Sequence, residues 1–479
     1  MVNLIIEIVI ILFGILLLLS LGSHFFVTDS QRSHKMALQK SLMQSEFKID
    51  QIQQDIDFLY TSLEHIHPEP YAHITKTDFQ IRVMELRNAA HTFLTRLELY
   101  KRLAPLISEM NDESVRLLVP ETELDYHYHI QGRFFPFDLR IIDRKGYIAR
   151  NYSNEARLRE GVEIISINDV PFHVMHRRLA QLFSGSCEAQ KSFYLSERFR
   201  EMLYLFYGMA EKYKLVIQDV SASKTVTYEV EGKPFKKNRE IPYAYQALKG
   251  NAAVLSLHGM SGDTKKYRKF LKRTFKSINK TGVNHLVLDL RRNQGGASIW
   301  GNLLLEYLTN EVYTAIKHMD IKSSPQVRQH YLGNIPPMLR WLPFARLHPV
   351  LKLLNVTQEG ETAGYVPPAV YPTGKTPQFK GKLTVLTSPG TSDSASLLAS
   401  VIREIERGRL IGEPCGGSAT NYGLRLKVHL PNTGLTAILP AAVIEGPSKG
   451  QIAADIHVKQ TVADLAALKD TVLETALHQ

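Results

Sequence analysis

The chain is poor in cysteine. Its 479 residues include only Cys187 and Cys415, which excludes a disulfide framework and a four-cysteine zinc site. The H-E-x-x-H zinc motif, the Walker phosphate loop and the dinucleotide-binding glycine fingerprint are also missing from the sequence. Three histidines, at positions 65, 67 and 73, lie beside prolines that break helical ligand spacing, so we interpret them as loop residues. We therefore expect no metal and no other cofactor.

Acidic residues are outnumbered by basic ones. The 58 lysines and arginines against 47 aspartates and glutamates give a formal net charge of +11. We interpret this excess as a solvated basic surface spread along the chain, of a kind that lies near anionic lipid. We see no stripe of cations interleaved with aromatics, and we therefore expect no nucleic-acid partner.

One long hydrophobic run is present, at the N-terminus. Residues 4–21 contain Glu7 as their only charge, and eighteen helical residues rise about 27 Å, close to the thickness of a hydrocarbon core. No positive side chain precedes the run and no A-x-A-like cleavage site follows it. Residues 1–27 are therefore predicted to be an uncleaved single-pass anchor, with a signal peptide or a buried helix as alternatives. Arg32 and Lys35 favour a cytoplasmic body under the positive-inside rule.

Hydrophobic periodicity divides the remaining chain into three regions. Apolar residues recur at helical spacing over residues 45–125, which predicts a small helical bundle. Short alternating segments over residues 126–230 predict a β module, with a hairpin turning at Asp143 and Arg144. Strands alternate with helices over residues 231–479, which predicts an α/β layer with a largely parallel sheet.

A proline-punctuated insertion, residues 322–378, interrupts the α/β region. Its segments 338–347 and 350–354 are apolar with spaced cations. Such segments fit an interfacial membrane contact or a lid, and they also fit helices that pack on their own domain. We favour packing.

Two segments about a hundred residues apart carry the candidate chemistry. A strand-like run ends in the sequence R-R-N-Q-G-G at residues 291–296, and the sequence T-S-D-S-A-S at residues 391–396 opens an apolar helix. A glycine turn can present backbone N–H groups, and a helix start can present a serine hydroxyl. Acyl transfer needs these two groups as an oxyanion hole and a nucleophile. The pair predicts a serine hydrolase, although serines at a helix start are also common N-caps.

These segments resemble those of the C-terminal processing (tail-specific) serine proteases, in particular the branch akin to tricorn protease and the retinoid-binding repeats. The resemblance spans most of residues 45–479 and includes I-G-E-x-x-G-G at 411–417, L-P-N-T-G at 430–434 and A-D-I-H-V at 454–458. It implies an α/β core of the ClpP/crotonase type, an N-terminal helical region and a small PDZ-like β module. It also implies an extracytoplasmic body, against the indication from the early cations.

The resemblance implies Ser394 as the nucleophile, because Ser394-Ala395-Ser396 matches the family's serine motif. The N–H of Ala395 and one from Gly295 or Gly296 would then form the oxyanion hole. Counting back from Gly412-Glu413 without a gap selects Asp393 instead, and Ser392 and Ser396 are weaker alternatives. Glu445 matches the acid that supports tricorn-like sites, although an exposed loop glutamate would look the same.

The family's general-base positions hold serines here. Ser114 occupies the position of the tricorn-like histidine and Ser418 that of the tail-specific lysine. A serine hydroxyl has a pKa too high to accept the nucleophile's proton at neutral pH. His258, Lys427 and His429 are the candidate replacements, none of them at a family base position.

Two functions therefore stay open. The first is a membrane-anchored serine peptidase that hydrolyses extended peptides or protein C-termini through an acyl-enzyme. The second is a catalytically degenerate relative that binds peptides or apolar ligands, and a membrane scaffold is a weaker third. Cys415 could be a nucleophile, but we interpret it as a small residue packed in its glycine loop.

Overall fold

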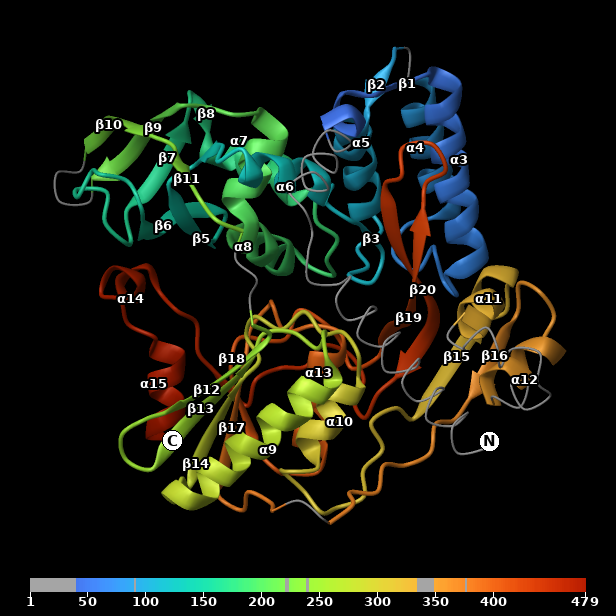
Figure 1. Cartoon of the computed structure of the whole chain (residues 1–479), viewed down its shortest axis with the longest axis vertical. Helices are drawn as coiled ribbons and strands as arrows, with labels where there is room; N and C mark the ends of the chain where they lie inside the picture. Colours follow the sequence, from blue (N-terminus) through green and yellow to red (C-terminus); the bar gives the residue numbers. More distant parts are fainter. Residues whose placement is uncertain (1–39, 90–91, 220–223, 238–240, 334–348, 375–376) are drawn as a thin grey trace, which may run out of the picture.

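The computed structural model describes residues 40–89, 92–219, 224–237, 241–333, 349–374 and 377–479. The predicted anchor 1–27 and the predicted segment 338–347 lie outside the described residues. Among the residues described, no helix combines the length and apolar composition of a bilayer span. An α/β core lies at one end of the molecule, and the helical region and β module lie side by side at the other (Figure 1).

The core is built on a six-stranded sheet with the order β12-β13-β14-β17-β18-β21. These strands are β12 (Tyr243–Ala247), β13 (Ala252–Leu257), β14 (His285–Asp289), β17 (Lys382–Thr387), β18 (Arg409–Gly412) and β21 (Ile456–His457). All neighbours from β13 to β21 are parallel, and only the edge strand β12 is antiparallel. The central strands are almost entirely buried, as a parallel sheet covered on both faces requires. The predicted largely parallel sheet is confirmed.

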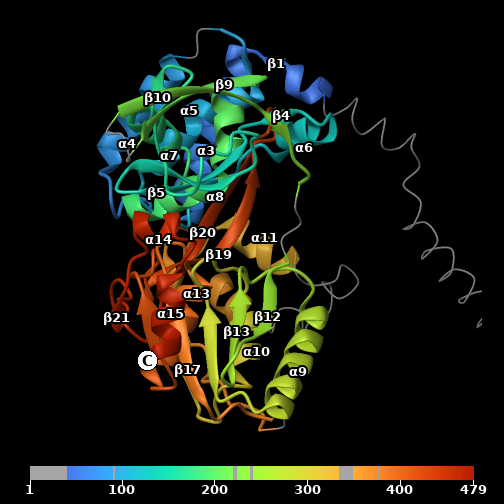
Figure 2. The ribbon, with the colours of Figure 1, turned by 90° about the vertical axis from the view of Figure 1, so that its left-hand side faces the viewer.

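Helices cover both faces of this sheet (Figure 2). They are α9 (Thr264–Thr281), α10 (Ile299–Leu305), α13 (Ser394–Glu404) and α15 (Thr471–His478). The short helix α14 (Val462–Ala466) lies apart from the sheet, toward the β module, where Ala466 approaches Gly161. Apolar residues of α9, α10 and α13 share one buried cluster with the sheet. Val472 and Ala476 of α15 belong to a second cluster, on the opposite face.

The positive charge, which we expected to be spread along the chain, is concentrated on helix α9. Its outer face gathers eight exposed cations and the helix contains no acidic residue. They are Lys265, Lys266, Arg268, Lys269, Lys272, Arg273, Lys276 and Lys280. The apolar residues between them, including Tyr267 and Phe275, point inward and are buried. The 3.6-residue period separates the two kinds of residue, which look mixed in the sequence.

The helical region contains α3 (Ile49–Ile66), α4 (Lys76–Asn88) and α5 (Arg96–Ser108), with the short strands β1 (Glu46–Phe47) and β2 (Leu94–Thr95). A long hairpin, β19 (Asn421–His429) and β20 (Thr436–Glu445), reaches from the core to α3. Asp55 of α3 accepts hydrogen bonds from the N–H groups of Asn432 and Thr433 in the hairpin turn, both at 2.9 Å. The sequence patterns did not predict these two strands.

The same hairpin belongs to a second sheet of the order β16-β15-β20-β19, and β3 (Arg116–Leu117) also pairs with β20. The insertion supplies β15 (His318–Lys322), β16 (Thr362–Tyr365), α11 (Pro325–Gly333) and α12 (Pro349–Val356). Val350 and Leu354 of α12 are buried in the main apolar cluster. The favoured packing of segment 350–354 on its own protein is therefore confirmed.

The β module is an antiparallel sheet of the order β10-β9-β7-β6-β5, with β8 paired to β7. Its elements are β5 (Phe137–Ile142), β6 (Lys145–Asn151), β7 (Glu163–Ile167), β8 (Val170–Pro171), β9 (Lys212–Asp219), β10 (Lys224–Glu231), α7 (Phe172–Ala180) and α8 (Glu188–Tyr207); α6 (Glu121–His129), β4 (Arg133–Phe134) and β11 (Lys233–Pro234) flank it. Asp143 and Arg144 form the predicted hairpin turn, both with positive φ.

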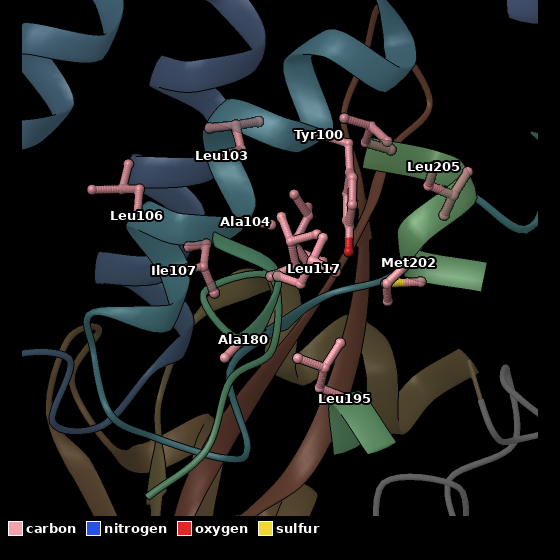
Figure 3. Close-up of a cluster of buried hydrophobic side chains, with 14 of the residues drawn as sticks. Tyr100, Leu103, Ala104, Leu106, Ile107, Leu117, Ala180, Leu195, Met202 and Leu205 are labelled. Carbon is pink, nitrogen blue, oxygen red and sulfur yellow. The ribbon is translucent and has the colours of Figure 1, made fainter. Parts of the chain in front are cut away.

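A shared apolar cluster joins the β module to the helical region. Tyr100 and Leu103 of α5 pack in it together with Leu195 and Met202 of α8 and with Leu117 of β3 (Figure 3). These side chains are all nearly inaccessible to solvent. Burial of this kind fixes α8 relative to α5, which matters because both elements border the candidate site.

Candidate active site

The glycine turn that follows β14 is shaped by one side chain and two close approaches. The Asn293 side-chain oxygen accepts the N–H of Gly295 at 2.9 Å. Gly295 has a φ of 80°, and a Cβ there would lie 2.5 Å from the Cβ of Asp393. A Cβ on Gly296, whose φ is 135°, would collide with the carbonyl oxygen of Met260. Only glycine fits at both positions.

Helix α13 begins at a strained residue. Asp393 immediately precedes the helix with φ 52° and ψ −129°, a region that residues with a side chain rarely occupy. A sharp, strained turn from strand to helix is the conformation that presents the nucleophile in many hydrolases. Here the residue at that turn is Asp393, which was the alternative from counting back, and Ser394 is the first residue of the helix.

The structure brings the two predicted segments together. The Ser394 hydroxyl donates to the carbonyl oxygen of Gly296 at 2.7 Å. The Gly296 N–H donates to Oδ2 of Asp393 at 3.0 Å. The N–H of Ser392 donates to the Asn293 carbonyl oxygen at 3.0 Å. The glycine turn therefore offers its carbonyl to Ser394 and its amide to Asp393.

All three predicted oxyanion donors already have acceptors within the protein. Gly295 N–H is held by Asn293 and Gly296 N–H by Asp393. Ala395 N–H donates to the Ser392 carbonyl oxygen at 3.1 Å. An oxyanion hole requires donors aimed at the reacting oxygen. In this conformation an incoming substrate must displace the Asp393 carboxylate to reach the Gly296 amide.

Asp393 is held by charge as well as by hydrogen bonds. Nη1 of Arg425 on β19 lies 2.9 Å from Oδ2 of Asp393, and the Asp393 side chain is only 9% exposed. Arg425 follows Leu424, whose φ of 54° interrupts the ladder between β19 and β20. Sequence reasoning missed Arg425. The available signal was the alternation of Arg425, Lys427 and His429 along one face of the strand.

A buried glutamate lies behind Asp393. Oε1 of Glu113 accepts the Asp393 N–H at 3.3 Å, and its other oxygen accepts from Gln190 of α8. Burial raises the pKa of Glu113, and the nearby Arg116 guanidinium opposes that rise. Gln190 also donates to the Tyr194 hydroxyl, which lies 3.0 Å from the Ser392 hydroxyl. Burial raises the pKa of Tyr194 to about 12, so this hydroxyl stays protonated at neutral pH.

The two serines predicted at general-base positions lie beside this cluster, but their hydroxyls bond elsewhere. The Ser114 hydroxyl donates to the Tyr422 carbonyl oxygen at 2.7 Å, and the Ser418 hydroxyl donates to the Gly450 carbonyl oxygen at 2.6 Å. Asp112 accepts the Ser114 N–H and binds the buried His67 ring at 2.9 Å. His67 is thus the one member of the histidine trio that contacts residues bordering the site.

The candidate replacement bases do not bond to Ser394. His429 contacts Thr436 at 3.0 Å at the far end of the hairpin, and Lys427 is exposed. His258 lies just after β13, where its backbone N–H donates to the Pro242 carbonyl oxygen. Over the part of the chain that the structure describes, no histidine or lysine side chain is hydrogen-bonded to the Ser394 hydroxyl.

Glu445 and Cys415 are two further residues that were predicted from the sequence to lie at or near the site. Glu445 ends β20, and its backbone carbonyl accepts Lys317 N–H at 2.8 Å. Cys415 is buried, and burial raises the pKa of its thiol to about 12. A thiol that stays protonated at neutral pH is a weak nucleophile, which agrees with its interpretation as a packed residue.

Comparisons with known proteins found one family model and several solved structures of similar fold. Residues 251–460 match the model of peptidase family S41. No curated protein matches the chain. Among solved structures, mature CPAF complexed with lactacystin is 14% identical with a TM-score of 0.60, covering 90% of this chain and 97% of that one. A mutant of CPAF is 14% identical with a TM-score of 0.62, covering 90% and 98%. At such identity the structural likeness shows a shared fold.

Proposed function

We propose that the chain, whose residues 251–460 match the model of peptidase family S41, hydrolyses peptide bonds in extended peptides or protein C-termini, with Ser394 as the nucleophile. The match to this family model supports serine peptidase activity. The observation that carries the assignment within this chain is the 2.7 Å contact between the Ser394 hydroxyl and the glycine turn. It joins a nucleophile at a helix start to the segment that holds the predicted oxyanion donors.

A small apolar cavity of about 40 Å³ beside Ser394 supports a preference for small apolar side chains. Its walls include Leu305, Leu397 and Val401. Hydrolysis at Ser394 also requires that Asp393 release the Gly296 amide as the carbonyl oxygen of the substrate arrives. Loss of one oxyanion-hole donor costs about 10²–10³ in rate, which is the scale of the effect that this release would have.

Labelling with a serine-directed fluorophosphonate tests this proposal directly. We expect modification at Ser394, loss of labelling in Ser394→Ala, and parallel loss of peptide cleavage measured by mass spectrometry. Ser45→Ala is the matched control, because the Ser45 hydroxyl also donates to a backbone carbonyl but lies on an exposed segment. Unchanged cleavage in Ser394→Ala would contradict the assignment.

A specific observation favours a second candidate function, peptide binding without hydrolysis. The Asp393 carboxylate takes the Gly296 amide, and the described histidines and lysines leave the Ser394 hydroxyl without a base. Loss of a general base costs about 10²–10⁴ in rate. Peptides that bind to the chain and are recovered intact, together with no fluorophosphonate labelling, would decide for this candidate.

We also propose that residues 1–27 anchor the protein in a membrane as a single span and that residues 126–230 act as a PDZ-like peptide module. The apolar run at 4–21 supports the anchor. The order of turn, strand, turn and helix from Glu160 to Ala180 supports the module. Carbonate extraction of membranes that contain the full chain or a chain beginning at residue 28 tests the anchor, which predicts retention of the full chain alone.

A further inference from the structure

Helix α9 carries an unbalanced charge that the candidate site does not use. Its eight exposed cations sum to +8, against a formal net charge of +11 for the whole chain. Asp263, which caps the helix by accepting the N–H groups of Lys265 and Lys266, is the only acidic residue between positions 241 and 288. Strands β12 and β13, which precede the helix, therefore supply no counter-charge. Among the described residues, none of the eight cations forms an ion pair.

The eight cations share one side of the helix, which we call the cationic face of α9. At about 100° per residue they fall within an arc of about 160°, on which Asn279 is the only other side chain. They extend from Lys265 to Lys280, a rise of about 23 Å along the helix axis. Helix α9 runs along the outside of the core (Figure 2), so this face is open to solvent.

The fold gains no stability from this arrangement. Like charges four residues apart repel one another and destabilise a helix. Five pairs of the cations have this spacing, at positions 265 and 269, 268 and 272, 269 and 273, 272 and 276, and 276 and 280. The opposite side holds α9 in place, where Tyr267 stacks on Trp300 with 4.1 Å between ring centroids. A charge cluster that opposes its own helix indicates an anionic partner.

The chemistry of the cationic face favours a lipid surface over a nucleic acid. Six of the eight cations are lysines, which are flexible point charges, whereas arginine is the residue suited to bidentate recognition of phosphate. The arc has no aromatic side chain on which a base could stack, because Tyr267 and Phe275 are buried and Phe270 packs on Tyr243. A fluid layer of anionic headgroups requires only a row of positive charges.

The mode of contact follows from the other side of the helix. Leu271, Phe275 and Ile278 belong to the buried cluster that α9 shares with the sheet. A helix that inserts into a bilayer interface needs a free apolar face, and α9 has none to offer. Contact through α9 is therefore electrostatic adsorption, which salt weakens.

We propose that the cationic face of α9 docks the core on an anionic phospholipid surface. Each basic side chain near such a surface strengthens binding by a factor of about 5, so several acting together give stable docking. The contact lies outside the candidate site and goes beyond the proposed hydrolysis. It stands whether or not residues 1–27 form an anchor, because an anchor holds the chain at a membrane, whereas α9 determines which side of the core faces it.

Lysine labelling of the full chain tests the proposal. The chain is incorporated into vesicles of phosphatidylcholine, either alone or with phosphatidylglycerol, and the reaction of each lysine with a water-soluble amine reagent is followed by mass spectrometry. We expect the α9 lysines to react at least about 5-fold more slowly on the anionic vesicles and to recover in high salt. Lys224 of β10 and Lys352 of α12, which are also exposed, should react equally on both.

Two quadruple variants with the same change of charge identify the surface responsible. The first carries Lys265→Gln, Lys269→Gln, Lys272→Gln and Lys276→Gln, and its remaining Lys280 should lose the protection by anionic vesicles. The second is the matched control, in which protection of Lys280 should persist. It replaces four exposed cations on other elements, by Arg177→Gln, Arg178→Gln, Lys224→Gln and Lys352→Gln.

Two results would overturn the proposal. One is equal labelling of the α9 lysines of the unaltered chain on the two kinds of vesicle. The other is protection of these lysines by a DNA duplex but not by anionic vesicles, which would assign the face to a nucleic acid. Peptide cleavage measured on the same samples reports separately on the proposed function, because the candidate site is built from residues outside α9.

Discussion

At the scale of single residues, the Glu113 carboxyl carries the clearest pH dependence. It is buried, and desolvation raises its pKa above the ordinary value of 4.5. The folded state therefore holds its proton at pH values where the unfolded chain has lost it. The contribution of Glu113 to stability is present below pH 4.5 and is lost as pH rises through its raised native pKa.

We predict that Glu113→Gln flattens the fall in unfolding free energy as pH rises above 4.5, measured by urea denaturation at a series of pH values. Glu98 supplies the opposite control. Hydrogen bonds from Thr95 lower its pKa, so its stabilising effect is lost as pH falls, and Glu98→Gln should change the acid side of the profile instead. A Glu113→Gln profile that runs parallel to that of the unaltered chain would disprove the assignment.

Substitutions at two glycines distinguish the energetic cost of backbone strain from that of steric crowding. Gly295 and Gly434 both have positive φ, but a Cβ on Gly434 would meet nothing within 4 Å, whereas one on Gly295 would lie 2.5 Å from Asp393. We predict that Gly434→Ala costs about 1 kcal/mol of unfolding free energy, from strain alone. Gly295→Ala should cost about 3 kcal/mol or more, because strain and overpacking add. Equal losses of unfolding free energy in the two variants, measured by chemical denaturation, would show that the Asp393 side chain moves aside at little cost.

The register at residues 393 and 394 shows where sequence reasoning stops. The local motif selected Ser394 and counting selected Asp393, and the two readings differ by one residue. The observed geometry depends on the φ of Asp393 and on donors from Gly296 and Arg425, which lie 97 positions before it and 32 after it in the chain. The segment 391–396 consists mainly of small polar residues, and this composition allows either Asp393 or Ser394 to be the residue at the turn.

At the scale of elements, Asp55 ties the β19–β20 hairpin to α3. It is fully buried and accepts the N–H groups of Asn432 and Thr433 and the Thr433 hydroxyl. We predict that Asp55→Ala costs about 3 kcal/mol, because several bonds to a charged acceptor are lost and their buried donors stay unpaired. Chemical denaturation measures this loss. Asp50→Ala, at an exposed position in the first turn of α3, should cost less than about 1 kcal/mol.

Strands and helices of the core were predictable because their periodicity is local. Strand β13 and helix α9 lie in the region where the alternation was predicted; both have regularly spaced apolar residues, and Asp263 caps the start of α9. The β19–β20 hairpin was not predictable from its own sequence. Strand β19 mixes Arg425 and Lys427 with half-buried positions, and the hairpin depends on α3, more than three hundred residues away. The same limit hid Arg425 from the candidate site.

At the scale of the whole molecule, the candidate site is where three units meet. Glu113 comes from the helical region, Gln190 and Tyr194 from α8 beside the β module, and Asp393 from the core. Periodicity predicted three units within the sequence, but it could not show that buried polar groups from different parts of the chain converge. That arrangement depends on contacts between residues separated by 77 to 280 positions.

The bond between Tyr194 and Ser392 offers a direct measure of this convergence. Because the Tyr194 hydroxyl accepts from Gln190, its own proton is available to the Ser392 oxygen, 3.0 Å away across the interface of α8 and the core. In a double-mutant cycle, Tyr194→Phe and Ser392→Ala should each destabilise the chain, and the double variant should lose about 1 kcal/mol less than the sum. The control pair, Tyr194→Phe with Thr281→Ala on α9, should be additive, since Thr281 bonds within its own helix. Additivity in both cycles would mean that the units touch at the site without supporting one another, and the geometry of Asp393 would then have to be held by the core alone.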